Sequence, residues 1–375
     1  MGNLQSLIER ASFFVDGMED PTGFRLFARS GVSPYARCFA IFSKALCQDH
    51  EWLDTRRDKL INDLNEELSI FYDVRTSLHL NLKMDKPFLQ LFCFSLSALN
   101  ILRGELSEKN RFVLEKYLND DLLAGLIERD VHGGSPGSGN HAMFVAILII
   151  AAQELLGLNK SKEIAAWLNF NANHINSHGF WGNYEKFSHL QFQNGYHQYE
   201  IFEFLGYDKA PWVQASLNTL SLADREGHFS PYPGGGGCYD YDAVFMLTSH
   251  YTGDIGQTHI LAKTLKSLVC EQNLDGGFCE SKLLRRNGIP RLASHIQHIT
   301  GQPRHLRFSS MITGLNLLRY KHRVVRTHWT EIDRRWDESN LWDTFFRLSA
   351  ISRICQFLDL PERKFFDNNN FPGIG

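Results

Sequence analysis

The chain of 375 residues lacks the features of membrane and exported proteins. No apolar run approaches the roughly 18 residues that span a bilayer, since the longest run covers Ala142 to Ala152. The N-terminus has no charged region followed by an apolar one, so no secretory signal is expected. No linker-like stretch interrupts the sequence, which therefore predicts one cytoplasmic domain over residues 1–375 without a transmembrane segment.

An excess of charge of one sign is also absent. Lys and Arg total 39, Asp and Glu total 42, and the formal net charge is −3, which favours no nucleic-acid partner. The seven cysteines form no Cys-x-x-Cys pair, so free thiols are expected rather than a structural zinc site. Phosphate-binding glycine loops, dinucleotide fingerprints, His-Glu-x-x-His and Gly-x-Ser-x-Gly are missing too, so no cofactor is expected.

What the sequence does contain is a series of helical patterns separated by Gly and Pro. Amphipathic segments alternate with segments that are apolar nearly all round, and the pair recurs about every 45 to 55 residues. Outer amphipathic and inner apolar helices predict about six helical hairpins in an all-α, (α/α)6-type toroid, with an open solenoid as the alternative. The expected helices are 34–46, 49–71, 88–102, 108–123, 140–156, 162–175, 196–205, 211–222, 239–251, 259–271, 308–320 and 341–357.

A short glycine-aromatic turn recurs after the amphipathic helices, at 177–181, 225–229 and 275–278. Glycine supplies the positive φ that ends a helix, and the following aromatic side chain is expected to pack between neighbouring hairpins. The long and poorly periodic segment 281–303 is interpreted as a lid or a loop insertion.

The segment 271–278 resembles the Gln-x-x-Asp-Gly-Gly-Phe repeat of the α-α toroid superfamily of terpenoid cyclases and protein prenyltransferases. Segments 227–243 and 341–348 have a similar layout, and the resemblance covers most of the chain from about residue 130 onward. It implies a ring of helical hairpins around one central cavity, which a small-molecule substrate would occupy. Fold resemblance alone does not identify the reaction, which depends on the site.

In a closed ring, the N-terminal ends of the inner helices would open onto the same end of the cavity. These ends carry partial positive charge and unpaired N–H groups, so polar side chains there would converge around a ligand. Each side chain alone could equally cap its helix. Those expected to bind substrate are Tyr35, Asn140, Tyr239, Arg307 and Trp342.

Asp240 and Asp242 follow four glycines at the start of an apolar segment. They resemble the first two carboxylates of the Asp-x-Asp-Asp motif of class II terpenoid cyclases, whose third carboxylate is missing here. The resemblance implies that Asp242 is the proton donor, that Asp240 tunes its pKa, and that aromatic walls stabilise a carbocation. The first hypothesis is therefore a biosynthetic, terpenoid-cyclase-like cyclase or isomerase, in which His141, Tyr196 and His197 relay protons.

A second resemblance concerns Asn140-His141 and Tyr196-His197, in which His141 and Tyr196 lie 55 positions apart. Alginate and heparinase-type polysaccharide lyases have an Asn-His pair followed at similar spacing by a catalytic tyrosine. The resemblance implies that Asn140 and His141 neutralise a uronate carboxylate and that Tyr196 is the acid or base of a β-elimination. The second hypothesis is a carbohydrate (uronate) lyase or epimerase-like enzyme, and the third is a non-catalytic toroid that binds a ligand or a protein.

Cys238, between Gly237 and Tyr239, resembles the zinc-binding cysteine segment of protein prenyltransferases. In that family an aspartate and a histidine complete the site. Gly236 replaces the aspartate here, and the histidine position falls near Arg307. No metal is therefore expected.

Overall fold

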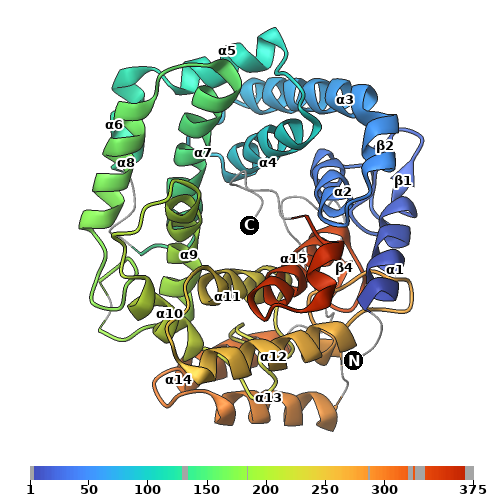
Figure 1. Ribbon diagram of the computed structural model, residues 1–375, viewed down its shortest axis with the longest axis vertical. Coiled ribbons are helices and arrows are strands. Elements are labelled where there is room, and N and C mark those ends of the chain that lie inside the picture. Colours follow the sequence, from blue (N-terminus) through green and yellow to red (C-terminus); the bar gives the residue numbers. More distant parts are fainter. Residues whose placement is uncertain are drawn as a thin grey trace. The chain divides into compact units, whose positions relative to one another are not determined.

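The computed structural model describes residues 4–128, 134–183, 185–285, 288–319, 324–325 and 334–367. Within these residues the chain is all-α, with fifteen α-helices and two short antiparallel β-ribbons (Figure 1). The predicted all-α class is confirmed. The closed (α/α)6 ring stays a prediction.

The helices range from 8 residues in α6 to 28 residues in α3. They are α1 (Leu4–Asp16), α2 (Pro34–Leu46), α3 (His50–Ser77), α4 (Lys86–Leu102), α5 (Glu108–Tyr117), α6 (Asp120–Ile127), α7 (Ser138–Leu156), α8 (Ser161–Asn173), α9 (His189–Phe204), α10 (Trp212–Leu220), α11 (Gly237–Ser249), α12 (Ile255–Cys270), α13 (Ile289–Gly301), α14 (Arg307–Arg319) and α15 (Leu341–Phe357). The ribbons pair β1 (Glu19–Asp20) with β2 (Gly23–Phe24) and β3 (Val324–Val325) with β4 (Arg334–Arg335), and the 3-10 turns are η1 (Leu283–Arg285) and η2 (Pro361–Phe365).

Local sequence signals explain several helix ends. Pro34 is the first residue of α2, where its missing N–H costs nothing and its fixed φ suits a helix. The Asp49 side chain accepts a hydrogen bond from the Trp52 N–H (3.3 Å) and so caps α3. In the same way, Asn340 caps α15 by accepting the N–H of Asp343 at 2.9 Å.

All twelve expected segments are helical, and 34–46 and 341–357 have the observed bounds. The expected helix 108–123 is divided into α5 and α6, and α1 and α13 were not expected. Because α13 and η1 occupy most of the described part of 281–303, this segment is mainly helical rather than a loop. Its role as a lid stays a prediction.

The chain divides into two compact units. Unit 1 comprises Met1–Gln48, Lys186–His189 and Pro211–Asn368. Unit 2 comprises Asp49–Glu185, Leu190–Ala210 and Asn369–Gly375. Each unit has its own apolar core, and the expected single domain stays a prediction.

In unit 1, α15 is the central helix and contacts α1, α2, α11 and α12. Its apolar side chains are almost completely buried, as the apolar pattern predicts. Aromatic rings join it to α2, since the Trp342 ring lies 4.9 Å from Phe39 and 4.8 Å from Phe346 between centroids. Such tilted arrangements stabilise a core beyond the area that they bury.

In unit 2, α4 and α7 form the core and contact each other. Both are buried on nearly all sides, whereas α3, α5 and α8 each bury a single stripe against them. The Trp167 indole of α8, which is 1% exposed, donates a hydrogen bond to the Ala142 carbonyl of α7 (2.9 Å). The predicted pairing of amphipathic with apolar helices is therefore confirmed within this unit.

Among the described residues, α7 is the one helix long and apolar enough to cross a membrane by length and composition. It has 19 residues, more than the apolar run within it, and 72% of its most apolar window is buried inside the protein. A core helix of a soluble protein has the same properties, so α7 is no clear transmembrane segment.

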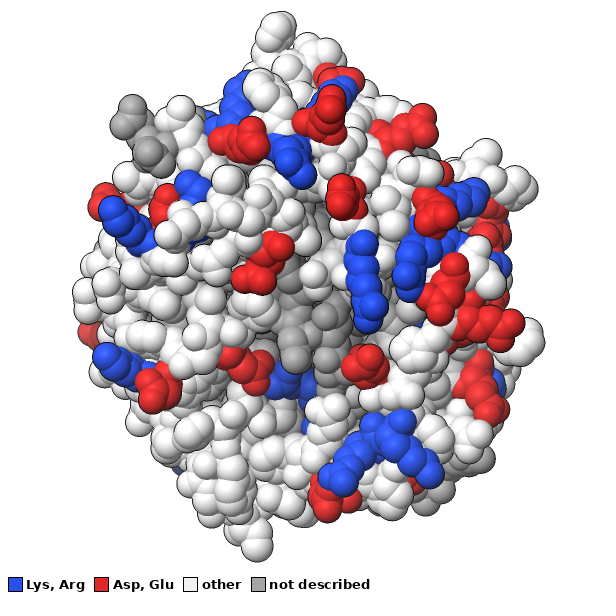
Figure 2. All heavy atoms as spheres, turned by 45° about the horizontal axis from the view of Figure 1, so that its top comes forward, with Lys and Arg blue, Asp and Glu red and all other residues white. Residues whose placement is uncertain are grey.

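Basic and acidic side chains are interspersed on the face of the molecule in Figure 2. On this face neither sign gathers into one large patch, as the balanced composition predicts. The balance of charge on this face offers no concentrated attraction there for a polyanion.

The three glycine-aromatic turns have the same backbone structure. In each turn, a backbone N–H donates a hydrogen bond to the carbonyl four residues later. The donors are the N–H groups of Asn176 (2.7 Å), Asp224 (2.8 Å) and Asn273 (2.9 Å). The glycines have positive φ, and the aromatic side chains that follow are fully buried, which confirms the predicted packing. However, each glycine closes a turn beyond the helix instead of ending the helix itself. The glycines are Gly179, Gly227 and Gly276, and the buried rings are Phe180, Phe229 and Phe278.

Candidate functional site

The predicted site residues divide between the two units. Because each unit is described by itself, a common cavity for all of them stays a prediction. Unit 2 contains Asn140, His141, Tyr196 and His197, and unit 1 contains Tyr35, Tyr239, Asp240, Asp242, Arg307 and Trp342.

In unit 2, the start of α7 lies directly against α9. A methyl group built on Gly139 would lie 1.7 Å from the Asn194 carbonyl oxygen, so only glycine permits this approach. The Asn194 side chain accepts a hydrogen bond from the Gly137 N–H (3.1 Å) and donates one to the Ser135 carbonyl (2.9 Å). The loop before α7 is therefore fixed to α9, which places the residues that follow Gly139 beside those that follow Asn194.

Three side chains from α4, α7 and α9 form a hydrogen-bonded row, which we call the Lys86–Asn140–His197 row. The Lys86 ammonium donates to the Asn140 Oδ1 at 3.2 Å. This contact turns the amide nitrogen toward His197, and the Asn140 Nδ2 to His197 Nε2 distance is 2.8 Å. Because an amide N–H can only donate, the His197 Nε2 must accept, and the ring proton is assigned to Nδ1.

Burial lowers the pKa of His197 to about 3, and the Lys86 charge lowers it further in the same direction. The imidazole is therefore neutral at pH 7, because burial and the neighbouring cation both disfavour the protonated ring. His197 is 8% exposed, and within the described part of the chain its Nδ1 has no hydrogen-bond partner. A buried donor without a partner costs free energy that a bound ligand could recover.

His141 precedes the apolar part of α7 and is 9% exposed. Its Nε2 lies 2.8 Å from the Lys83 carbonyl oxygen, which can only accept. The ring proton is therefore assigned to Nε2, and Nδ1 carries the lone pair. His141 and His197 thus present opposite tautomers, one with a basic Nδ1 and one with an Nδ1–H donor.

Tyr196 lies deeper than the sequence suggests. Its side chain is fully buried, and its hydroxyl donates to the Glu200 carboxylate one turn further along α9 (3.4 Å). The Tyr196 and His197 ring centroids lie 4.6 Å apart. The geometry supports packing against His197, and the predicted proton transfer by Tyr196 stays a prediction.

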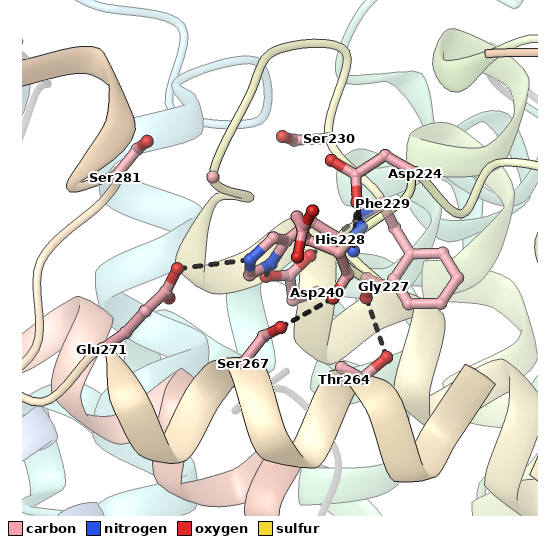
Figure 3. A network of polar contacts seen from close by, with 12 residues as sticks. Asp224, Gly227, His228, Phe229, Ser230, Asp240, Thr264, Ser267, Glu271 and Ser281 are labelled. Carbon is pink, nitrogen blue, oxygen red and sulfur yellow. Dashed lines mark hydrogen bonds and ion pairs between the residues drawn. The ribbon is translucent and has the colours of Figure 1, made fainter. Parts of the chain in front are cut away.

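In unit 1, Asp240 belongs to a buried cluster of four charged side chains, shown in part in Figure 3. His228 contacts Asp240 through Nδ1 (2.8 Å) and Glu271 through Nε2 (3.2 Å). Arg347 forms ion pairs with the same two carboxylates, and Asp240 also accepts the Phe229 N–H at 2.9 Å. We call His228, Asp240, Glu271 and Arg347 the charged quartet.

The quartet contains two cations and two anions. Burial alone would lower the pKa of His228, but Asp240 and Glu271 raise it well above its usual range. Burial alone would raise the pKa of Asp240, but His228 and Arg347 lower it. Asp240 is therefore held as a carboxylate, and the quartet joins α11, α12 and α15 around a glycine-aromatic turn.

Asp240 and Asp242 do not occupy one face of α11, because residues two apart on a helix do not face each other. The predicted carboxylate pair therefore finds no support in the helix geometry. Asp242 is 3% exposed and lies near a different group of acidic side chains. Burial raises the pKa of the Cys238 thiol, and Asp242, Glu280 and Asp343 raise it further. These carboxylates lie at the start of α11, where a methyl group on Gly237 would be 2.4 Å from an Asp343 oxygen.

The remaining unit 1 residues have structural partners or neighbours. The Arg307 guanidinium donates to the Gln302 and Thr300 carbonyls at 3.0 and 3.1 Å, and so binds the end of α13. Trp342 is 9% exposed and belongs to the aromatic cluster of α15, and Tyr35 is 2% exposed at the start of α2. Tyr239 is partly exposed, and burial raises its pKa.

No group of three His, Cys, Asp or Glu side chains that could bind a metal ion occurs within the described ranges. The seven cysteines are free thiols. The Cys238 segment thus resembles a zinc site in sequence, without a ligand set around it in the residues that the structure describes.

No protein-family model matches the chain, and no curated protein or solved structure is significantly similar to it. The terpenoid-cyclase and lyase resemblances therefore remain resemblances of short motifs.

The sequence did not point to several of the residues that organise these sites. Lys86 is an exposed residue before Pro87 and had no visible link to Asn140, which is 54 residues away. His228 does lie in a recognised turn, and its position before a buried aromatic was an available signal. Arg347, fully buried in an apolar helix, was the clearest signal for an ionic partner.

Proposed function

We propose that the chain is an enzyme that transfers a proton on a small substrate bearing a carboxylate, as in a uronate lyase or epimerase. Its site would be formed by Lys86, Asn140, His141 and His197 of unit 2. The observation that carries this proposal is the Lys86–Asn140–His197 row, in which a buried histidine is neutral and keeps its proton on an unpartnered Nδ1.

The row suits a carboxylate group chemically. Lys86 supplies a positive charge at an exposed position, and His197 supplies an N–H donor at a buried one. A neutral imidazole with a lowered pKa can polarise an oxygen by hydrogen bonding without giving up its proton. A bound anion would also oppose the desolvation that lowers the pKa of His197.

Proton transfer itself is assigned to His141, whose Nδ1 carries the lone pair. Removal of the proton from the carbon beside the carboxylate breaks a C–H bond and leaves negative charge on the carboxylate oxygens. Lys86 and His197 would stabilise this charge. The His141 imidazolium would then give its proton to the departing β-oxygen, which completes an elimination. Proton delivery from water to the opposite face of the same carbon would instead give an epimer, with His141 releasing its own proton to solvent.

Turnover on a panel of polyuronates and uronate monosaccharides tests the proposal, with unsaturated and epimerised products as the readouts. His141→Gln should lower kcat by about 10²–10⁴-fold, the usual contribution of a general base. His259→Gln, at an exposed position of α12, is the matched control and should retain the wild-type rate. Failure to turn over any uronate, or full activity of His141→Gln, would contradict the proposal.

A second candidate is a terpenoid-cyclase-like cyclase or isomerase with Asp242 of unit 1 as the proton donor. The observation that favours it is that the charges of Asp242, Glu280 and Asp343 all raise the pKa of the Cys238 thiol, together with the aromatic residues of α15 beside Asp343. Aromatic faces stabilise cations. Unchanged turnover of an isoprenoid substrate by Asp242→Asn would rule this candidate out.

A further inference from the structure

Helices α13 and α14 of unit 1 pack together as a hairpin (Figure 1). The polarity of this hairpin is reversed, since it buries polar side chains and exposes apolar ones. On α13 the buried side chains are polar: Arg291, Ser294, His295 and His298 are all less than 9% exposed. The apolar side chains of the same helix point to solvent, with Ile289 82%, Leu292 49% and Ile296 53% exposed.

The second helix repeats this reversal. Near its start and middle α14 buries the small residues Ser310 and Gly314, and a methyl group on Gly314 would be 3.1 Å from His295 Nδ1. The large apolar side chains of α14 are exposed by 40 to 68%. These are Phe308, Met311, Ile312 and Leu315.

The exposed side chains follow helical spacing. Positions 289, 292 and 296 share one face of α13, and positions 308, 311, 312 and 315 share one face of α14. Polar contacts instead connect the hairpin internally and to its unit, since Arg291 donates to the Leu317 carbonyl (2.7 Å) and His298 contacts Asp224 (3.3 Å). Two regular apolar stripes on one hairpin are more than the scattered exposure of an ordinary surface.

The charge of the surrounding sequence indicates what covers these stripes. Residues 281–330 contain ten of the 39 Lys and Arg residues, of which Arg291 is buried within the hairpin, and none of the 42 Asp and Glu residues. In a chain with net charge −3, this segment alone is strongly basic. The binding partner must therefore offer both negative charge and an apolar phase.

We propose that the α13–α14 hairpin binds the surface of an anionic lipid bilayer, with its exposed Ile, Leu, Met and Phe side chains entering the interface between headgroups and acyl chains. Amphipathic helices with basic flanks bind membranes in this way, through apolar burial and attraction to anionic lipid. A second copy of the same hairpin would place two basic segments together, which repulsion opposes. A nucleic acid would leave the apolar stripes exposed.

Sedimentation of the full chain with phosphatidylcholine vesicles, with and without phosphatidylserine, tests the proposal. We expect binding to the anionic vesicles only, and weaker binding as salt increases. Phe308→Ser should weaken it roughly tenfold by removing the most exposed ring of α14, and Arg304→Glu should weaken it roughly tenfold by reversing a charge. Leu274→Ser, at a fully exposed leucine outside the hairpin, is the control and should bind like the wild type.

Circular dichroism of each variant should show unchanged helix content, so that lost binding is not lost folding. Absence of binding to anionic vesicles, or equal weakening by Leu274→Ser, would overturn the proposal. Self-association that Phe308→Ser abolishes would also overturn it and would identify the stripes as an interface between copies. Because vesicle binding needs no turnover, this result is independent of the proposed uronate chemistry.

Discussion

At the scale of single residues, Asp240 and Asp242 lie two positions apart in α11 yet have different surroundings. Asp240 is held ionised by His228 and Arg347, so it stabilises the fold. Asp242 lies among other carboxylates near Cys238. The sequence identified both as acidic residues at a helix start, but it could not separate them, because the partners come from a turn and from α15.

Removal of Arg347 tests the structural role of the charged quartet. Arg347→Met leaves Asp240 buried with only one of its two cations, so we expect the free energy of unfolding to fall by about 3–5 kcal/mol. Arg353→Met is the control on the same helix, since Arg353 is only half-buried and donates to the hydroxyls of Thr248 and Ser249. It should cost about 1 kcal/mol. Urea-induced unfolding measures the free energy of unfolding of both variants. Equal losses in Arg347→Met and Arg353→Met would contradict a structural role for the charged quartet.

At the scale of helices, the approach of α7 to α9 depends on one residue without a side chain. Gly139→Ala would place a methyl group against the Asn194 carbonyl, so the helices must move apart. We expect a loss of stability of about 1–3 kcal/mol from this overpacking. Gly125→Ala in α6 is the matched control, because outside the backbone of its own helix no atom of the described residues lies within 4 Å of the added methyl group.

Because alanine favours a helix over glycine, Gly125→Ala should stabilise the protein by up to about 1 kcal/mol. In thermal or urea unfolding, the free energy of unfolding should therefore fall for Gly139→Ala and rise for Gly125→Ala. A neutral or stabilising Gly139→Ala would show that α7 and α9 do not meet as described.

Hydrophobic periodicity predicted the helices well where the apolar face is the buried one, as in α2 and α15. It missed α13, because that helix buries its polar face and exposes its apolar one. In the Lys86–Asn140–His197 row, the sequence predicted Asn140 and His197 as site residues, because both lie near the start of an expected helix. Lys86 was missed because only the fold brings it to Asn140.

At the scale of the whole molecule, buried histidines predict sensitivity to acid. The pKa values of His189 and His197 are lowered to about 3 and that of His295 to about 4, chiefly by burial. Unfolding restores the pKa of each histidine to about 6.5. Between about pH 4 and pH 6.5 the unfolded chain therefore binds more protons than the folded chain. Stability should therefore fall as the pH falls from about 6.5 toward 4.

The raised pKa of His228 adds almost no slope below about pH 6.5, because there His228 is protonated in both the folded and the unfolded chain, and its opposite effect on stability lies at higher pH. His189 and His197 each contribute a slope of about 1.4 kcal/mol per pH unit within the window. Urea midpoints at pH 7, 6 and 5 measure the net effect. A midpoint that stays constant or rises toward pH 5 would contradict this prediction.

Closure of a ring was the one global feature that sequence could suggest but not determine. Helix periodicity and turn motifs describe each hairpin and its neighbour. Closure depends instead on contacts between distant parts of the chain, which no local pattern specifies. The described structure accordingly confirms the helices, the recurring turns and the layering of unit 2, and leaves the common cavity as a prediction.

The state of the His197 ring tests the central claim most directly. In nitrogen NMR of the histidine-labelled protein, we predict a neutral ring protonated at Nδ1 that does not titrate between pH 8 and about pH 4. Saturating glucuronate should perturb this signal in the wild type and not in Asn140→Leu. A His197 that titrates near pH 6.5, carries its proton on Nε2, or ignores every uronate would contradict the account.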